Sequence, residues 1–157
     1  PYSFKNRIMA SMCAQLMSAR LLSEVREKEG ATYSISTNGV LERTSDVPLV
    51  YQTIFPMKPE KKDRALEIIR NEFTKLAQQV DEAELAKVKE FMVKHFAEME
   101  RTNSYWCSEI AGNELLPSEL PTDTQAVIES IGAADICSFM KELEAQHNYR
   151  VFVVMPM

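Results

Sequence analysis

The chain has 157 residues, of which 45% are hydrophobic and 26% are charged. This composition fits one compact domain with its own core and excludes a disordered chain. The 23 acidic residues outnumber the 18 basic ones, and the net charge of −5 excludes an electrostatic footprint for nucleic acid or anionic lipid. We therefore expect no nucleic acid as a partner. Because no stretch approaches the roughly 20 apolar residues of a membrane-spanning helix, we also expect no membrane as a partner.

The cysteines and the first residue bear on the origin of the chain. Cys13, Cys107 and Cys137 lie far apart, which fits neither a disulfide framework nor a C-x-x-C metal site. We interpret all three as small buried apolar residues, and a cytoplasmic or a periplasmic location is compatible with them. The chain opens at Pro1 without an initiator Met, so we expect either a processed product or an excised piece of a larger protein.

The first third of the chain predicts a helix followed by a hairpin. Apolar residues recur at spacings of three and four over residues 6–29, which predicts an amphipathic helix with one buried stripe. Gly30 supplies the residue that ends it. Residues 31–41 and 48–57 are rich in β-branched side chains and predict two antiparallel strands, joined by the polar loop 42–46.

Two longer helices are predicted next. Residues 59–80 start at a proline and repeat apolar positions at helical spacing. Asp81 and Glu84 resemble a capping box, which opens a third helix over residues 81–99. The polar residues 102–104 either bend this helix or end it.

The last third predicts two short helices. Residues 116–121 contain two prolines and are expected to form a loop, after which Thr122 or Asp123 can cap a helix. The helical segments 123–131 and 133–146 are separated by a glycine.

Residues 149–155 are almost all apolar and favour β structure, so we predict a buried last strand. The predicted order is helix, two strands, several helices and a strand. This order indicates an α+β domain in which helices pack on a mainly antiparallel β-sheet. Without an internal repeat or a linker, residues 1–157 are expected to form a single domain.

Motifs for metal hydrolysis are missing from the sequence. His95 and His147 are the only histidines, and neither stands in H-E-x-x-H or H-x-x-E-H. We interpret His95 as a hydrogen-bonded histidine at the edge of the core and assign no catalytic role to His147. No G-x-S-x-G elbow or glycine-rich phosphate loop is present. By itself, the chain is expected to be non-catalytic.

One local group of residues has the hydrogen-bond donors to bind a ligand. Arg26 closes a helix, Gly30 reverses the chain and Tyr33 begins a strand, so both side chains can meet at the helix-to-strand corner and hydrogen-bond a peptide carbonyl. The alternative is purely local: Arg26 stabilises the C-terminus of the helix and pairs with Glu27 or Glu29, and Tyr33 packs at the edge of the core.

The same residues resemble a known family. The run Leu-x-x-x-Val-Arg-Glu-Lys-x-Gly-x-x-Tyr-Ser at positions 21–34 resembles the C-terminal-half domain of the pitrilysin/insulinase (M16) family of zinc metallopeptidases. The order of elements agrees along nearly the whole chain. It includes a helix opened by Pro59 and Glu60, the long helix after Asp81 and the helix start at 132–136.

The resemblance implies a two-layer metallopeptidase-like (LuxS/MPP-like) fold and a peptidase M16 C-terminal-type domain. In that family the zinc motif lies in the N-terminal domain, so the segment needs no cofactor of its own and zinc belongs to the parent or a partner chain. An Arg and a Tyr seven residues apart reach the substrate, which implies that Arg26 and Tyr33 bind substrate and can steady an oxyanion. The implied function is that of a non-catalytic, substrate-binding domain of a zinc-dependent metalloendopeptidase.

The resemblance also implies partners. These are an unfolded peptide or small protein as substrate, and the catalytic N-terminal half of the same protein or a partner subunit. The usual opening strands are missing before Pro1, and an unpaired sheet edge would let the fragment form a homodimer. One alternative is a structural or assembly subunit, although a pure scaffold needs neither Arg26 nor Tyr33. The other is an unrelated binding module.

Overall fold

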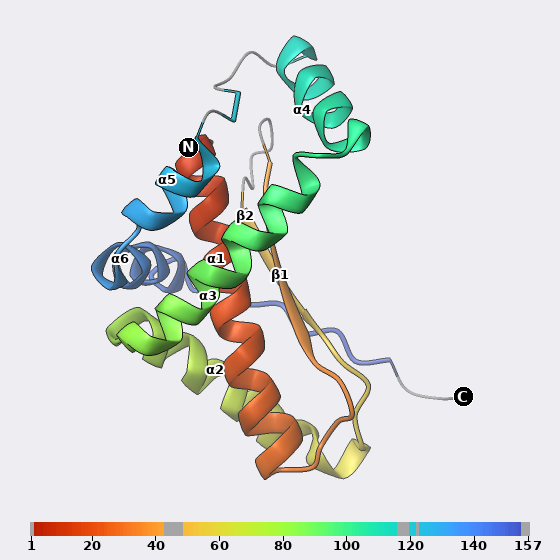
Figure 1. Cartoon of the computed structure of the whole chain (residues 1–157). Coiled ribbons are helices and arrows are strands. Elements are labelled where there is room, and N and C mark those ends of the chain that lie inside the picture. The colour runs from red at the N-terminus through yellow and green to blue at the C-terminus, as the bar shows by residue number, and fades with distance from the viewer. Residues whose placement is uncertain (1, 43–48, 116–119, 122, 155–157) are drawn as a thin grey trace.

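The computed structural model describes residues 2–42, 49–115, 120–121 and 123–154 and confirms an α+β architecture (Figure 1). The elements follow one another in this order: α1 Phe4–Leu21, the π-helix η1 Leu22–Lys28, β1 Ser36–Leu41, β2 Leu49–Ile54, the 3-10 helix η2 Pro59–Lys61, α2 Lys62–Gln78, α3 Glu82–Met99, α4 Asn103–Leu115, α5 Thr124–Ser130 and α6 Ala133–Glu144.

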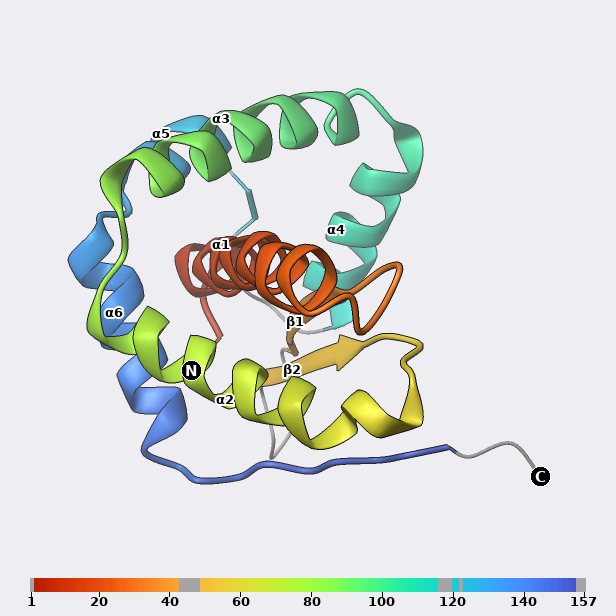
Figure 2. The ribbon, with the colours of Figure 1, turned by 90° about the horizontal axis from the view of Figure 1, so that it is seen from below.

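Helix α1 lies at the centre of the molecule. Seen from below, α2, α3, α4, α5 and α6 surround it, and the hairpin lies against it (Figure 2). The predicted single buried stripe is therefore wrong, because neighbouring positions on several faces are buried. The buried residues of α1 are Phe4, Ile8, Met9, Ala10, Met12, Cys13, Ala14, Leu16, Met17 and Leu21. Each face has a partner, since α1 contacts β1, α2, α3, α5 and α6.

The two strands pair antiparallel, from Ser36 opposite Ile54 to Leu41 opposite Leu49. Polar contacts join this hairpin to α1. The Ser18 hydroxyl accepts a hydrogen bond from the Thr37 amide at 2.8 Å and donates one to the Thr37 carbonyl at 3.1 Å. The first strand is shorter than predicted, because the residues just before Ser36 form a turn.

Specific caps and an ion pair place the helices after the hairpin. The Asp81 carboxylate accepts hydrogen bonds from the amides of Ala83 and Glu84, which confirms the predicted start of α3. The Glu84 carboxylate does not close a capping box but binds Arg20 of α1, with Nη2–Oε2 at 2.8 Å. Asp123 caps α5 by accepting from the Ala126 amide. Helix α2 packs on α6, and α3 packs on α5.

Helix α3 ends at Met99, just before the polar residues 102–104, and the separate helix α4 begins among them at Asn103, so the chain ends α3 here and does not merely bend it. The Thr102 hydroxyl oxygen accepts from the Tyr105 amide at 3.3 Å and so serves the first turn of α4. The predicted loops fall partly on residues 43–48 and 116–119, and the alternative cap Thr122 is likewise outside the described residues.

The buried last strand is not found. Residues 149–154 are extended without strand pairing, and the side chains of Phe152 and Val154 are 89% and 94% exposed. In both ribbon views this segment runs away from α6 past the hairpin (Figures 1 and 2). Its apolar composition predicts a need for burial, but the sheet within the described residues is formed by β1 and β2 alone.

The cysteines occupy three different environments. Cys13 is buried, Cys137 is half-buried and Cys107 is exposed, and all three are free thiols. The prediction of three buried cysteines is therefore correct for Cys13 and wrong for Cys107, which lies on the outer side of α4. Within the described residues, no helix is both long enough and apolar enough to cross a membrane.

Candidate functional site

The candidate site is built on the π-helix that continues α1. Arg26 lies on η1, where the exposed guanidinium leaves the helix, while the neighbouring Val25 is fully buried and anchors the segment. π-Helical segments within α-helices are rare and occur frequently at functional sites.

A glycine turn ends η1. The Gly30 amide donates to the Arg26 carbonyl at 3.1 Å, and the Ala31 amide donates to the Val25 carbonyl at 3.1 Å. Gly30 has a φ of 59°, the left-handed conformation that glycine adopts without steric cost. This turn confirms the predicted reversal of the chain at Gly30.

A second small turn presents Tyr33 to solvent. The Thr32 hydroxyl donates to the Ser34 carbonyl at 2.8 Å and accepts from the Ser34 amide at 3.2 Å. Ala31, Thr32 and Ile35 are buried around this turn, whereas the side chain of Tyr33 is 89% exposed. The backbone on both sides is thus held in place while the phenol projects outward.

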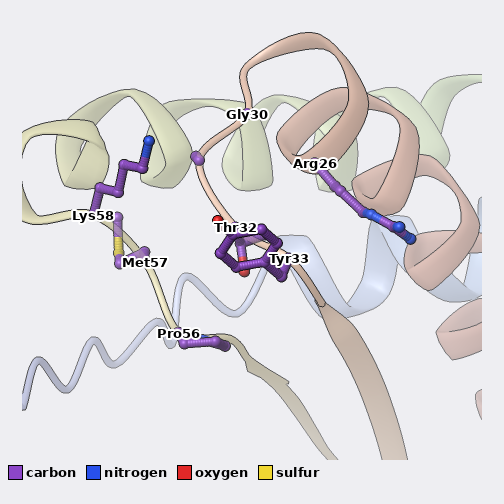
Figure 3. Close-up of a pocket in the computed structure, with 8 residues that line it drawn as sticks. Arg26, Gly30, Thr32, Tyr33, Pro56, Met57 and Lys58 are labelled. Atoms are coloured by element: carbon purple, nitrogen blue, oxygen red, sulfur yellow. The ribbon is translucent and has the colours of Figure 1, made fainter.

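Arg26 and Tyr33 line the same open cavity, which we call the turn cavity (Figure 3). Its volume is about 450 Å³. Its lining residues are Arg26, Gly30, Ala31, Thr32, Tyr33, Pro56, Met57 and Lys58. The far wall follows β2 and is joined to the turn by the Lys58 amide, which donates to the Ala31 carbonyl at 3.4 Å.

The two cationic side chains of the turn cavity lack ion-pair partners among the described residues. Nearby cations are paired: Arg64 and Lys61 bind Glu29, at 3.1 and 3.9 Å. No such pair within the described residues includes Arg26 or Lys58. The local alternative, in which Arg26 pairs with a neighbouring glutamate and Tyr33 packs at the core edge, is therefore not what the structure shows.

The wall formed by Pro56, Met57 and Lys58 was missed by sequence reasoning. Pro59 after Lys58 is a local signal, because a residue before proline is held in extended backbone, and Lys58 has φ −74° and ψ 130°. The signal does not reveal that Lys58 faces the Gly30 turn, since that depends on how the hairpin pairs.

The described residues do not fit a zinc site. Within them, no three side chains of His, Cys, Asp or Glu are placed to hold a metal ion. His95 is exposed on α3, where its ring stacks on Phe91 with centroids 5.7 Å apart and meets Phe96 edge-on. These aromatic contacts replace the hydrogen bond expected for His95. His147 follows α6 with a φ of 49°.

Several solved structures share this fold, and three of them are compared with it. A conserved protein from Enterococcus faecalis V583 has a TM-score of 0.66 at 19% identity, and the periplasmic protease PqqL from Escherichia coli has 0.69 at 19%. The ferredoxin protease FusC, solved as a mutant in complex with Arabidopsis ferredoxin, has a TM-score of 0.71 at 12% identity. These matches cover 83%, 90% and 91% of this chain.

The same matches span only 32%, 16% and 16% of those three proteins, so the chain corresponds to a minor part of each. None of the curated proteins matches the sequence. A family model described as the peptidase M16 inactive domain matches residues 1–92, which is 92 of the 157 residues and includes the whole turn cavity. The chain belongs to the peptidase M16 inactive-domain family, as the resemblance at positions 21–34 predicts.

Proposed function

We propose that this chain is the non-catalytic, substrate-binding domain of a zinc-dependent metalloendopeptidase. The zinc belongs to a catalytic N-terminal half, on the same polypeptide or on a partner subunit. The observation that carries the proposal is the turn cavity, where Arg26 and Tyr33 project from two sides of a fixed backbone turn.

The chemistry of the pair suits a peptide backbone. The guanidinium of Arg26 has five N–H donors in a planar fork, and the phenol of Tyr33 adds an O–H donor. Both groups can donate to a carbonyl oxygen of a bound peptide. A donor already in place when negative charge develops on that oxygen stabilises the transition state more than the substrate.

The cavity suits an extended chain segment more than a small buried ligand. It is open and combines the apolar surfaces of Ala31, Pro56 and Met57 with the donors of Arg26 and Tyr33. An unfolded peptide or a small protein is therefore the proposed substrate. The complex of the structural neighbour FusC with ferredoxin supports a protein substrate for a relative of this fold.

The test compares the complete natural polypeptide with this segment alone, for zinc content and for hydrolysis of a fluorogenic peptide library. We expect the complete polypeptide, with its partner chain if it has one, to bind one zinc and cleave peptides, and the segment to do neither. A complete assembly with neither zinc nor activity would overturn the proposal and favour a scaffold or assembly subunit.

A further inference from the structure

The turn cavity has a charge opposite to that of the chain. Its lining holds two cationic side chains, Arg26 and Lys58, and no acidic one, although the whole chain has a net charge of −5. The carboxylate of Glu29 lies close by in sequence but is bound to Lys61 and Arg64. Glu24 is likewise bound to Lys28 at 2.6 Å. These two carboxylates are thus neutralised by cations that do not line the cavity.

We propose that Lys58 is a specificity-determining residue that binds a carboxylate of the substrate peptide next to the bond held by Arg26 and Tyr33. The inference rests on the proposed function, because it names a preference of the same site. It adds a residue outside the 21–34 motif and a substrate class, namely peptides with a carboxylate beside an apolar side chain.

The position of Lys58 is fixed by its backbone. Pro59 restricts Lys58 to extended backbone geometry. The amide of Lys58 donates a hydrogen bond to the Ala31 carbonyl at 3.4 Å. In the close-up, Lys58 and Arg26 lie on opposite sides of Tyr33 in this view (Figure 3). A peptide that extends along this lining from Arg26 past Tyr33 therefore reaches Lys58.

The surroundings of Lys58 favour a single carboxylate within a peptide. Pro56 and Met57, which precede Lys58 in the chain, add apolar surface to the same lining, which suits a neighbouring apolar side chain. A lysine is a compact point charge that pairs with one carboxylate without a fixed fork geometry. The exposure of Lys58 limits the strength of such a pair, so the expected preference is modest.

A peptide can offer Lys58 a carboxylate in two ways, from the side chain of Asp or Glu or from a free C-terminus. The experiment therefore uses a neutral reference peptide with both ends blocked and one Gln. A first set replaces neutral positions by Glu one at a time. A second version of the reference has a free C-terminus. Cleavage by the complete polypeptide is measured as kcat and KM, and binding by fluorescence anisotropy after zinc is removed with a chelator.

We expect Lys58→Gln to raise KM and the dissociation constant about two- to fivefold for one carboxylate peptide, with kcat unchanged and the reference peptide unaffected. Lys58→Arg retains the charge and should retain the preference. Lys87→Gln, which removes an exposed lysine on α3 away from the cavity, should leave every peptide unaffected. An effect confined to a Glu position or to the free C-terminus identifies which carboxylate is bound.

The inference is overturned if Lys58→Gln changes no carboxylate peptide, or changes all peptides equally. The variant Arg26→Ala in the same assay separates this failure from failure of the proposed function. If Arg26→Ala impairs every peptide while Lys58→Gln is inert, only the role of Lys58 fails. If Arg26→Ala is also without effect, or the complete polypeptide neither binds nor cleaves any of the peptides, the proposed function and the inference both fail.

Discussion

The backbone carbonyl of Arg26 accepts a hydrogen bond from the amide of Gly30 at 3.1 Å. This bond closes the end of η1 and reverses the chain within four residues. As a result, Arg26 on the helix and Tyr33 beyond the turn line one cavity instead of facing opposite sides of the molecule. The turn is thus the part of the fold on which the candidate site depends.

Gly30→Ala should lower the free energy of unfolding by about 1–2 kcal/mol, because an L-residue with a Cβ is strained in the left-handed region. An added Cβ would meet no atom within 4 Å, so the cost is purely conformational. Gly30→Asn is the matched control and should cost less, since Asn tolerates this region. Urea unfolding measures both variants, and equal stability of Gly30→Ala and the parent chain would show that the left-handed turn is not required.

Gly39→Ala should lower the free energy of unfolding by about 1–3 kcal/mol for a steric reason. The new Cβ would lie 2.9 Å from the Ala10 carbonyl oxygen and 2.6 Å from the Tyr51 ring. Tyr51 has little freedom to give way, because its hydroxyl donates to the same Ala10 oxygen at 2.8 Å. Unchanged stability in urea would contradict the close packing of β1 on α1.

Leu16→Ala should cost about 2–5 kcal/mol, because it removes a fully buried side chain from the centre of α1 and leaves a cavity. Leu115→Ala is the matched control. Leu115 is 79% exposed at the end of α4, so its truncation should change stability by less than about 0.5 kcal/mol. Similar losses for the two variants in urea unfolding would argue against a central position of α1.

Thiol reactivity should separate the cysteines. Burial raises the pKa of the Cys13 thiol to about 12, from an ordinary value of 9.0, so little thiolate forms in the folded state. A maleimide at pH 8 should modify the exposed Cys107 rapidly and Cys13 only after unfolding. Because unfolding releases the Cys13 proton at lower pH, the contribution of this thiol to stability is lost as pH rises from about 9.0 towards 12.

The control for this measurement is Cys107→Ser, in which the fast label at position 107 should disappear while labelling of Cys13 in unfolded protein persists. Mass spectrometry of peptides locates the label. Rapid modification of Cys13 in the folded chain would show that the α1–hairpin interface opens readily.

Local sequence signals were enough to predict the turn at Gly30, because the residues that form it lie close together in the chain. The substrate-binding role of Arg26 and Tyr33 came from the resemblance at positions 21–34 and stays a prediction. Local signals were not enough for Lys58, which reaches the cavity through hairpin pairing. Residues 149–154 show the same limit: apolar composition indicates that a segment favours burial, but not whether a pairing strand is present.

Helix α1 illustrates a different limit. Its apolar residues are so dense that helical periodicity predicts a helix correctly without revealing how many faces are covered. Burial of adjacent positions such as Met12, Cys13 and Ala14 depends on partners that arrive from several distant segments. Tertiary packing, and not local propensity, decides this part of the fold.

The most direct test of the central claim is kcat/KM of the complete polypeptide for a cleaved peptide after changes at the turn cavity. Arg26→Ala should lower it about ten- to a hundredfold through loss of charged hydrogen bonds, and Tyr33→Phe about two- to tenfold through loss of one neutral donor. Arg101→Ala, an exposed arginine outside the cavity, should match the parent enzyme. Folded Arg26→Ala and Tyr33→Phe variants that cleave as well as Arg101→Ala would contradict a role of this cavity in binding substrate.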